Sequence, residues 1–153
     1  TPPAIQSLAI RTIGAAVAIL VGVVLALGFG LLATRTGLDR ARFLYPAVMA
    51  VIAVLYAGFA IAGGSVHALA LESIGAIVFL LASIAGFRWS LWIIVAALIG
   101  HGLFDLVHPT LISNPGVPVW WPGFCGAYDV AAGLYLAWLL STNRIRNWHT
   151  VTS

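Results

Sequence analysis

Charge is scarce in this sequence. Only 7% of its 153 residues are charged, 62% are hydrophobic, and lysine is missing altogether. Soluble domains carry about 25% charged residues, so the composition excludes an ordinary soluble domain, and the lack of lysine excludes the Schiff base of a rhodopsin. The net charge of +3 rests on too few positions for a nucleic-acid-binding surface. The composition predicts an integral membrane protein with the lipid bilayer as its surroundings.

Cysteine is nearly absent as well. Cys125 stands alone, so the chain can form no internal disulfide and has no CxxC or Cys/His finger spacing. The sequence also lacks a P-loop, a Rossmann glycine fingerprint and a nucleophile elbow. Cys125 is expected to be a small buried residue first, although its thiol is a soft ligand.

Long apolar runs are what the sequence has in abundance. A membrane-spanning helix needs about 20 apolar residues, and five such helices are predicted, over about 13–33, 43–61, 68–87, 90–107 and 123–140. The first run is too long for a signal peptide and is expected to be retained. Pro109 is expected to stop the fourth helix, because proline cannot continue the backbone hydrogen bonds. The predicted fold is an all-α bundle of five transmembrane helices, forming one domain over residues 1–153.

The arginines predict how this bundle is oriented. With five spans, six arginines fall on one side of the membrane and Arg11 alone on the other. Loops rich in arginine stay in the cytoplasm, so the N-terminus is predicted outside and the C-terminus in the cytoplasm. The expected location is a bacterial inner membrane, crossed several times.

Acidic residues interrupt the apolar runs. Three of the four acids, Glu72, Asp105 and Asp129, lie within predicted spans, where an unpaired charge costs several kcal/mol and marks a candidate functional site. His101, Asp105 and His108 follow i, i+4, i+7 spacing and share one helix face. The predicted topology places all five residues at one depth near the outer surface, on three different helices.

Several chemistries fit this polar layer. An imidazole and a carboxylate one turn apart can chelate a metal ion, and a zinc-type site is predicted from Asp105 and one histidine with Glu72 or Asp129 from a neighbouring helix. The candidate metal ligands are His101, Asp105, His108, Glu72 and Asp129. Without a metal, His101, Asp105 and Asp129 are candidate catalytic acid or base groups. The same residues also suit simple hydrogen bonding between helices.

The C-terminal third carries a set of motifs: HxxxDxxHP from His101, NPGVP from Asn114, WWP from Trp120, then Cys125 and the Tyr128-Asp129 pair. Together they resemble the motifs of a family of small uncharacterised bacterial multi-pass membrane proteins. That resemblance implies no activity. The intramembrane histidines and aspartate are also loosely similar to membrane hydrolases of the alkaline-ceramidase and adiponectin-receptor type, which implies a zinc-dependent hydrolase. This chain differs from that type in having five predicted spans rather than seven and no HxxxH pair.

Two functions are therefore expected. The first is a membrane-embedded enzyme, metal-dependent in the zinc-site interpretation, that acts on a lipid or another apolar small molecule through the His/Asp/Glu layer. The alternative is a non-catalytic integral subunit of a larger membrane complex. In that case the polar layer and the Trp120-Trp121 pair would bind partner subunits, a pigment or a metal.

Overall fold

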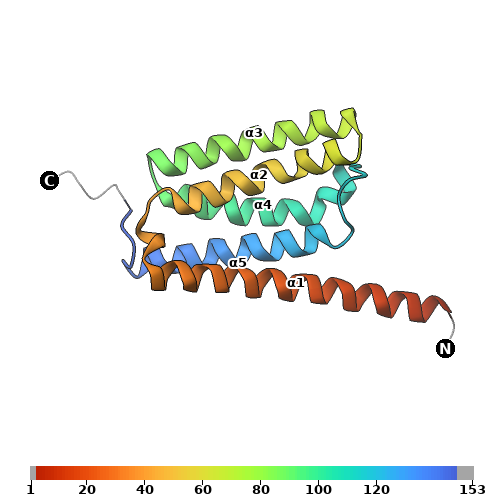
Figure 1. Cartoon of the computed structure of the whole chain (residues 1–153), viewed down its shortest axis with the longest axis horizontal. Helices are drawn as coiled ribbons and strands as arrows, with labels where there is room; N and C mark the ends of the chain where they lie inside the picture. Colours follow the sequence, from red (N-terminus) through yellow and green to blue (C-terminus); the bar gives the residue numbers. More distant parts are fainter. Residues whose placement is uncertain (1–2, 148–153) are drawn as a thin grey trace.

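The computed structural model describes residues 3–147, and these residues form a bundle of long helices (Figure 1). The elements follow one another as α1 (Pro3–Thr36), the short 3-10 helix η1 (Leu38–Arg40), α2 (Leu44–Ala62), α3 (Val66–Arg88), α4 (Leu91–Leu111) and α5 (Trp121–Ser141). The described residues contain no strand. Five helices are long and apolar enough to cross a membrane, which confirms the predicted all-α bundle.

The helix boundaries differ from the prediction at two places. Helix α1 begins at Pro3, well before the expected start near residue 13. Helix α4 does not stop at Pro109 as expected, but continues to Leu111. Proline removes only the one N–H that would bond to the carbonyl of Asp105. The N–H of Ile112 then bonds to the carbonyl of His108 at 2.9 Å, so the last turn closes around the proline.

Helix α4 is the centre of the bundle. It contacts α5, α3 and α2, while α1 packs on the other side of α5. The largest fully buried apolar side chains, which include Met49, Ile94, Leu98 and Leu136, come from α2, α4 and α5. The core therefore lies around α4, and α1 forms an outer layer beside α5 (Figure 1).

Glycines bring α4 and α5 unusually close. A Cβ atom on Gly102 would lie 2.7 Å from the carbonyl oxygen of Gly126, and one on Gly126 would lie 2.9 Å from the carbonyl oxygen of Gly102. Two turns further along α5, a Cβ on Gly133 would lie 2.8 Å from the side chain of Ile99 on α4. Small residues at such crossings let two backbones touch in a membrane. The contact shows that the Gly133 side of α5 faces α4.

The bundle has two distinct ends (Figure 1). One end carries the α2–α3 turn and the segment 112–120 between α4 and α5, and we call it the loop end. The other carries η1, the α3–α4 turn and the residues after α5, and we call it the arginine-rich end. Six of the seven arginines lie at the arginine-rich end: Arg35, Arg40, Arg42, Arg88, Arg144 and Arg146.

Candidate metal centre

Four buried side chains meet where α4 crosses α5. His101 and Asp105 stand one turn apart on α4, and Cys125 and Asp129 stand one turn apart on α5. Their side chains are 3%, 0%, 4% and 0% exposed, in that order. One ligand atom from each residue lies within 4.8 Å of all the others. We call these four residues the ligand cluster.

The glycine contact explains why the two pairs face each other. Gly102 follows His101, and Gly126 follows Cys125, so the point of closest approach sits inside the cluster. A side chain at either glycine would hold the helices apart. The sequence thus builds the cluster from two i, i+4 pairs and the two small residues that let these pairs meet.

The distances within the cluster suit a single ion. His101 Nδ1 is 2.7 Å from Asp129 Oδ2 and 3.7 Å from Asp105 Oδ2, and Cys125 Sγ is 3.8 Å from Asp129 Oδ2. Ligand atoms around a tetrahedral zinc ion, at about 2.0–2.3 Å from the metal, are about 3.3–3.5 Å apart. The three separations lie on both sides of that value, so small side-chain adjustments would complete a tetrahedral set.

Two oxygen atoms of the cluster lack a hydrogen-bond donor among the described residues. They are Asp105 Oδ2 and Asp129 Oδ1, both fully buried. A buried acceptor without a partner costs about 1–3 kcal/mol, and more when it is charged. Imidazole, carboxylate and thiolate are the groups that bind zinc, so this donor set together with its unpartnered oxygens fits a divalent cation. The ligand cluster could hold a metal ion.

Tyr56 of α2 fixes the position of one ligand. Its hydroxyl donates a 2.7 Å hydrogen bond to Asp105 Oδ1, which leaves the other oxygen of that carboxylate for the cluster. The Tyr56 ring also stacks on His108, with 4.0 Å between the ring centroids. The sequence alone does not reveal this role of Tyr56, because no spacing rule links α2 to the motif on α4.

Glu72 and His108 form a second polar contact outside the ligand cluster. His108 Nε2 is 2.8 Å from Glu72 Oε1, and Asn114 Nδ2 donates to the same oxygen at 2.9 Å. Both members are buried, at 4% and 1% exposure. The structure thus divides the five predicted ligands: it brings His101, Asp105 and Asp129 together and places Glu72 with His108. Along a helix, positions 101 and 108 are about 10.5 Å apart, which is too far for one ion.

An apolar groove reaches the ligand cluster from the side of the bundle. Its volume is about 460 Å³, and its wall includes Val51 and Leu55 of α2 and Phe124, Cys125 and Tyr128 of α5. Cys125 therefore belongs both to the groove wall and to the ligand cluster. The groove gives a path along which an apolar molecule can approach the buried donors.

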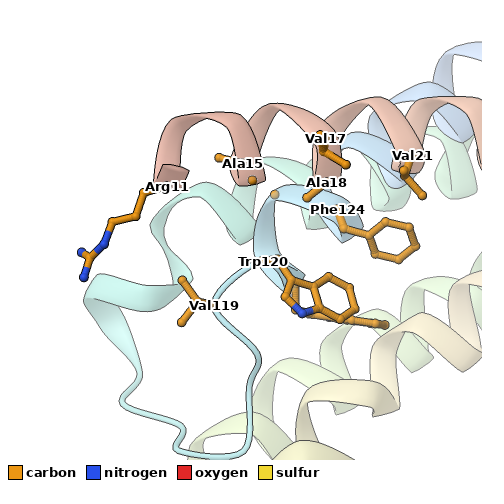
Figure 2. A pocket seen from close by; sticks show the side chains of 11 residues that line it. Arg11, Ala15, Val17, Ala18, Val21, Val119, Trp120 and Phe124 are labelled. Carbon is orange, nitrogen blue, oxygen red and sulfur yellow. The ribbon is translucent and has the colours of Figure 1, made fainter. Parts of the chain in front are cut away.

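A larger crevice of about 930 Å³ lies beside this groove, between the N-terminal half of α1 and the start of α5. Trp121 and Phe124 line both spaces. Figure 2 shows Trp120 and Phe124 beneath α1, with Arg11 at the edge of the crevice pointing away from them. Among the described residues that line the crevice, none belongs to the ligand cluster.

Compared with protein-family models, curated proteins and solved structures, the chain has no match in any of the three. The resemblances noted from its motifs therefore stay predictions. The function has to be inferred from the chemistry of the ligand cluster and the groove that reaches it.

Proposed function

We propose that this chain is a metal-dependent enzyme of the membrane that acts on a lipid or another apolar small molecule. His101, Asp105, Cys125 and Asp129 hold a divalent ion, with zinc favoured by the donor set. The observation that carries the proposal is the position of Cys125, which joins a buried group of metal-binding side chains to an apolar groove. Glu72 of α3 and His108 of α4 contact each other outside the ligand cluster. They are not ligands in this proposal.

A divalent ion held there would supply Lewis acidity toward a carbonyl or phosphoryl oxygen. The protein's own groups have separate tasks. Tyr56 orients Asp105 through its hydrogen bond, and His101 and Asp129, 2.7 Å apart at Nδ1 and Oδ2, each direct one ligand atom to the same point. If the ion is lost, the same His101–Asp129 contact has the form of a general base and its orienting carboxylate, so His101, Asp105 and Asp129 are the catalytic candidates in both versions.

The groove supports an apolar substrate. Its volume of about 460 Å³ falls in the range of about 300–1,000 Å³ that is typical of small-molecule sites. Its wall is almost entirely aliphatic and aromatic, and it includes Trp121, whose indole N–H is buried without an acceptor among the described residues. An acyl chain lying along α2 would fit this wall, and the Trp121 N–H would be available to a polar head group near Cys125.

The orientation belongs to the proposal as well. Six arginines at one end of the bundle against Arg11 near the other favour a cytoplasmic arginine-rich end and an external N-terminus. This orientation puts the ligand cluster nearer the outer surface of a bacterial inner membrane. A substrate from the outer leaflet would then reach the groove without crossing the bilayer.

A specific observation favours a second candidate, a non-catalytic subunit of a membrane complex. All four donors come from the protein and are at most 4% exposed, and structural zinc sites are closed by four protein ligands whereas catalytic ones keep an open position. In this case the ion would only tie α4 to α5. Trp120, which is 52% exposed, would contact a partner subunit.

Turnover of lipids tests the first candidate. The purified protein, loaded with zinc or stripped with a chelator, is reconstituted in vesicles of a mixed polar-lipid extract, and the lipids are followed by mass spectrometry. We expect the amount of at least one lipid species to change with the zinc-loaded protein and to stay constant with the chelator-stripped protein. Tyr56→Phe should slow this reaction about tenfold, in the range for loss of an outer partner of a ligand.

Tyr45→Phe is the matched control for that variant. Tyr45 also lies on α2, and its buried hydroxyl has no hydrogen-bond partner among the described residues, so removal of that hydroxyl should leave turnover unchanged. Full zinc occupancy without any change in the lipids would contradict the enzyme and leave the structural subunit.

A further inference from the structure

A second cavity lies at the arginine-rich end, away from the groove and the ligand cluster. It has a volume of about 280 Å³ and is lined by Asp39 and Arg40 of η1, Arg42, Leu91, and the segment from Arg144 to Arg146. Two separate stretches of the chain, one at η1 and one after α5, therefore bring arginines to one cavity, and the start of α4 adds Leu91. In the fold these stretches meet because η1, the start of α4 and the end of α5 share this end of the bundle (Figure 1).

The cavity carries a strong positive charge. Among the described residues that line it, four are arginines and one, Asp39, is an acid. Asp39 is only 4% exposed, and its Oδ2 accepts a 2.7 Å hydrogen bond from the hydroxyl of Thr34. A neutral donor, the Thr34 hydroxyl, thus already occupies one oxygen of the acid in the described part of the wall. The excess of positive charge in the cavity wall favours binding of an anion.

Aromatic rings hold two of these arginines in place. The guanidinium carbon of Arg144 lies 4.5 Å from the ring centroid of Trp138, and that of Arg42 lies 5.7 Å from the ring centroid of Phe87. For Arg144, this contact uses the face of the guanidinium and leaves its N–H groups pointing outward in its plane. In this geometry arginine binds phosphate with two parallel hydrogen bonds.

The surroundings of the cavity match the depth of lipid head groups. Trp89, Trp138 and Phe43 lie at the same end of the bundle and are 62%, 43% and 57% exposed. Exposed aromatic residues at helix ends mark the boundary between hydrocarbon and water. Basic pockets between transmembrane helices at this depth bind the head groups of anionic lipids.

We propose that the cavity formed by Arg40, Arg42, Arg144 and Arg146 binds the phosphate of an anionic phospholipid. The lipid phosphate enters the hollow, and its acyl chains lie along the apolar outer surface of the bundle. This site is independent of the metal centre. It tethers η1 to the residues after α5 at the arginine-rich end of the bundle.

Native mass spectrometry of the full chain in detergent tests the site, with phosphatidylglycerol and phosphatidylcholine as probes. We expect a one-to-one complex with phosphatidylglycerol and none with phosphatidylcholine at the same concentration. The double substitution of Arg40→Gln and Arg146→Gln should weaken the complex about 10–30-fold, since each arginine near a lipid surface contributes about 1 kcal/mol.

The matched control removes two charges at the same end but outside the cavity. Arg35→Gln with Arg88→Gln lowers the net charge equally, and both residues are exposed, so this variant should bind phosphatidylglycerol less than about threefold more weakly if the cavity is a real site. Equal losses in the two double variants would overturn the proposal, because binding would then follow overall charge. Inorganic phosphate that displaces phosphatidylglycerol at low millimolar concentration would overturn it as well, in favour of a soluble anion.

Discussion

Gly126→Ala should abolish tight metal binding without touching any ligand. The new methyl group would lie 2.9 Å from the carbonyl oxygen of Gly102 and 3.2 Å from Cβ of Asp105. One contact is with backbone and cannot be relieved by a side-chain rotation, so α4 and α5 must separate. Overpacking of this kind costs about 1–3 kcal/mol of stability, and the separation moves the His101–Asp105 pair away from the Cys125–Asp129 pair. Zinc titration of the chelator-stripped protein measures the effect.

Gly100→Ala is the control for this prediction. Gly100 lies on α4, two residues from Gly102, and a Cβ atom there would meet nothing within 4 Å. Because alanine favours a helix over glycine by about 1 kcal/mol, this variant should fold at least as well as the native chain and bind zinc normally. A Gly126→Ala protein that keeps native zinc affinity would show that the helix crossing does not assemble the site.

Asp129→Asn and Glu72→Gln should separate the two polar groups that the sequence placed in one site. Asparagine keeps the shape of Asp129 but loses the charge and the ligand that contacts both His101 and Cys125. Loss of an outer partner lowers metal affinity about 10–100-fold, so loss of a direct ligand should exceed about 100-fold. Competition with a coloured chelator measures the zinc affinity of the Asp129→Asn and native proteins directly.

Glu72→Gln should leave zinc affinity within about threefold, because Glu72 contacts His108 and Asn114 rather than the cluster. Its expected effect is on stability, about 1–3 kcal/mol, from the charge-assisted bond lost to His108. The opposite pattern, with zinc lost in Glu72→Gln and kept in Asp129→Asn, would move the metal to the predicted ligands Glu72 and His108.

Much of the fold could be predicted because hydrophobic runs of the right length report membrane spans directly. The centre of each span followed from composition alone. The ends of the helices did not follow from composition. Helix α4 continues through Pro109, because a proline in the last turn removes only one hydrogen bond. Helix α1 continues back to Pro3 through residues that are polar enough to hide the helical pattern.

The site was only partly predictable, for a physical reason. Spacing on α4 placed His101 with Asp105, and the structure brings Asp129 of α5 to His101. Tyr56 and Cys125 could not be assigned, because their roles depend on the rotation of α2 and α5 about their axes, which packing sets. The same limit explains why Glu72 and His108 were grouped with the other predicted ligands. The α4 face that carries both histidines contacts α5 at His101 and α3 at His108.

X-ray absorption at the zinc edge tests the metal centre most directly. The purified protein, loaded with one equivalent of zinc, should show one sulfur neighbour at about 2.3 Å and nitrogen or oxygen neighbours at about 2.0–2.1 Å. Cys125→Ser should remove the sulfur signal while the other neighbours stay. A protein that retains no stoichiometric zinc, or a zinc ion surrounded by nitrogen and oxygen alone in the native chain, would contradict the account.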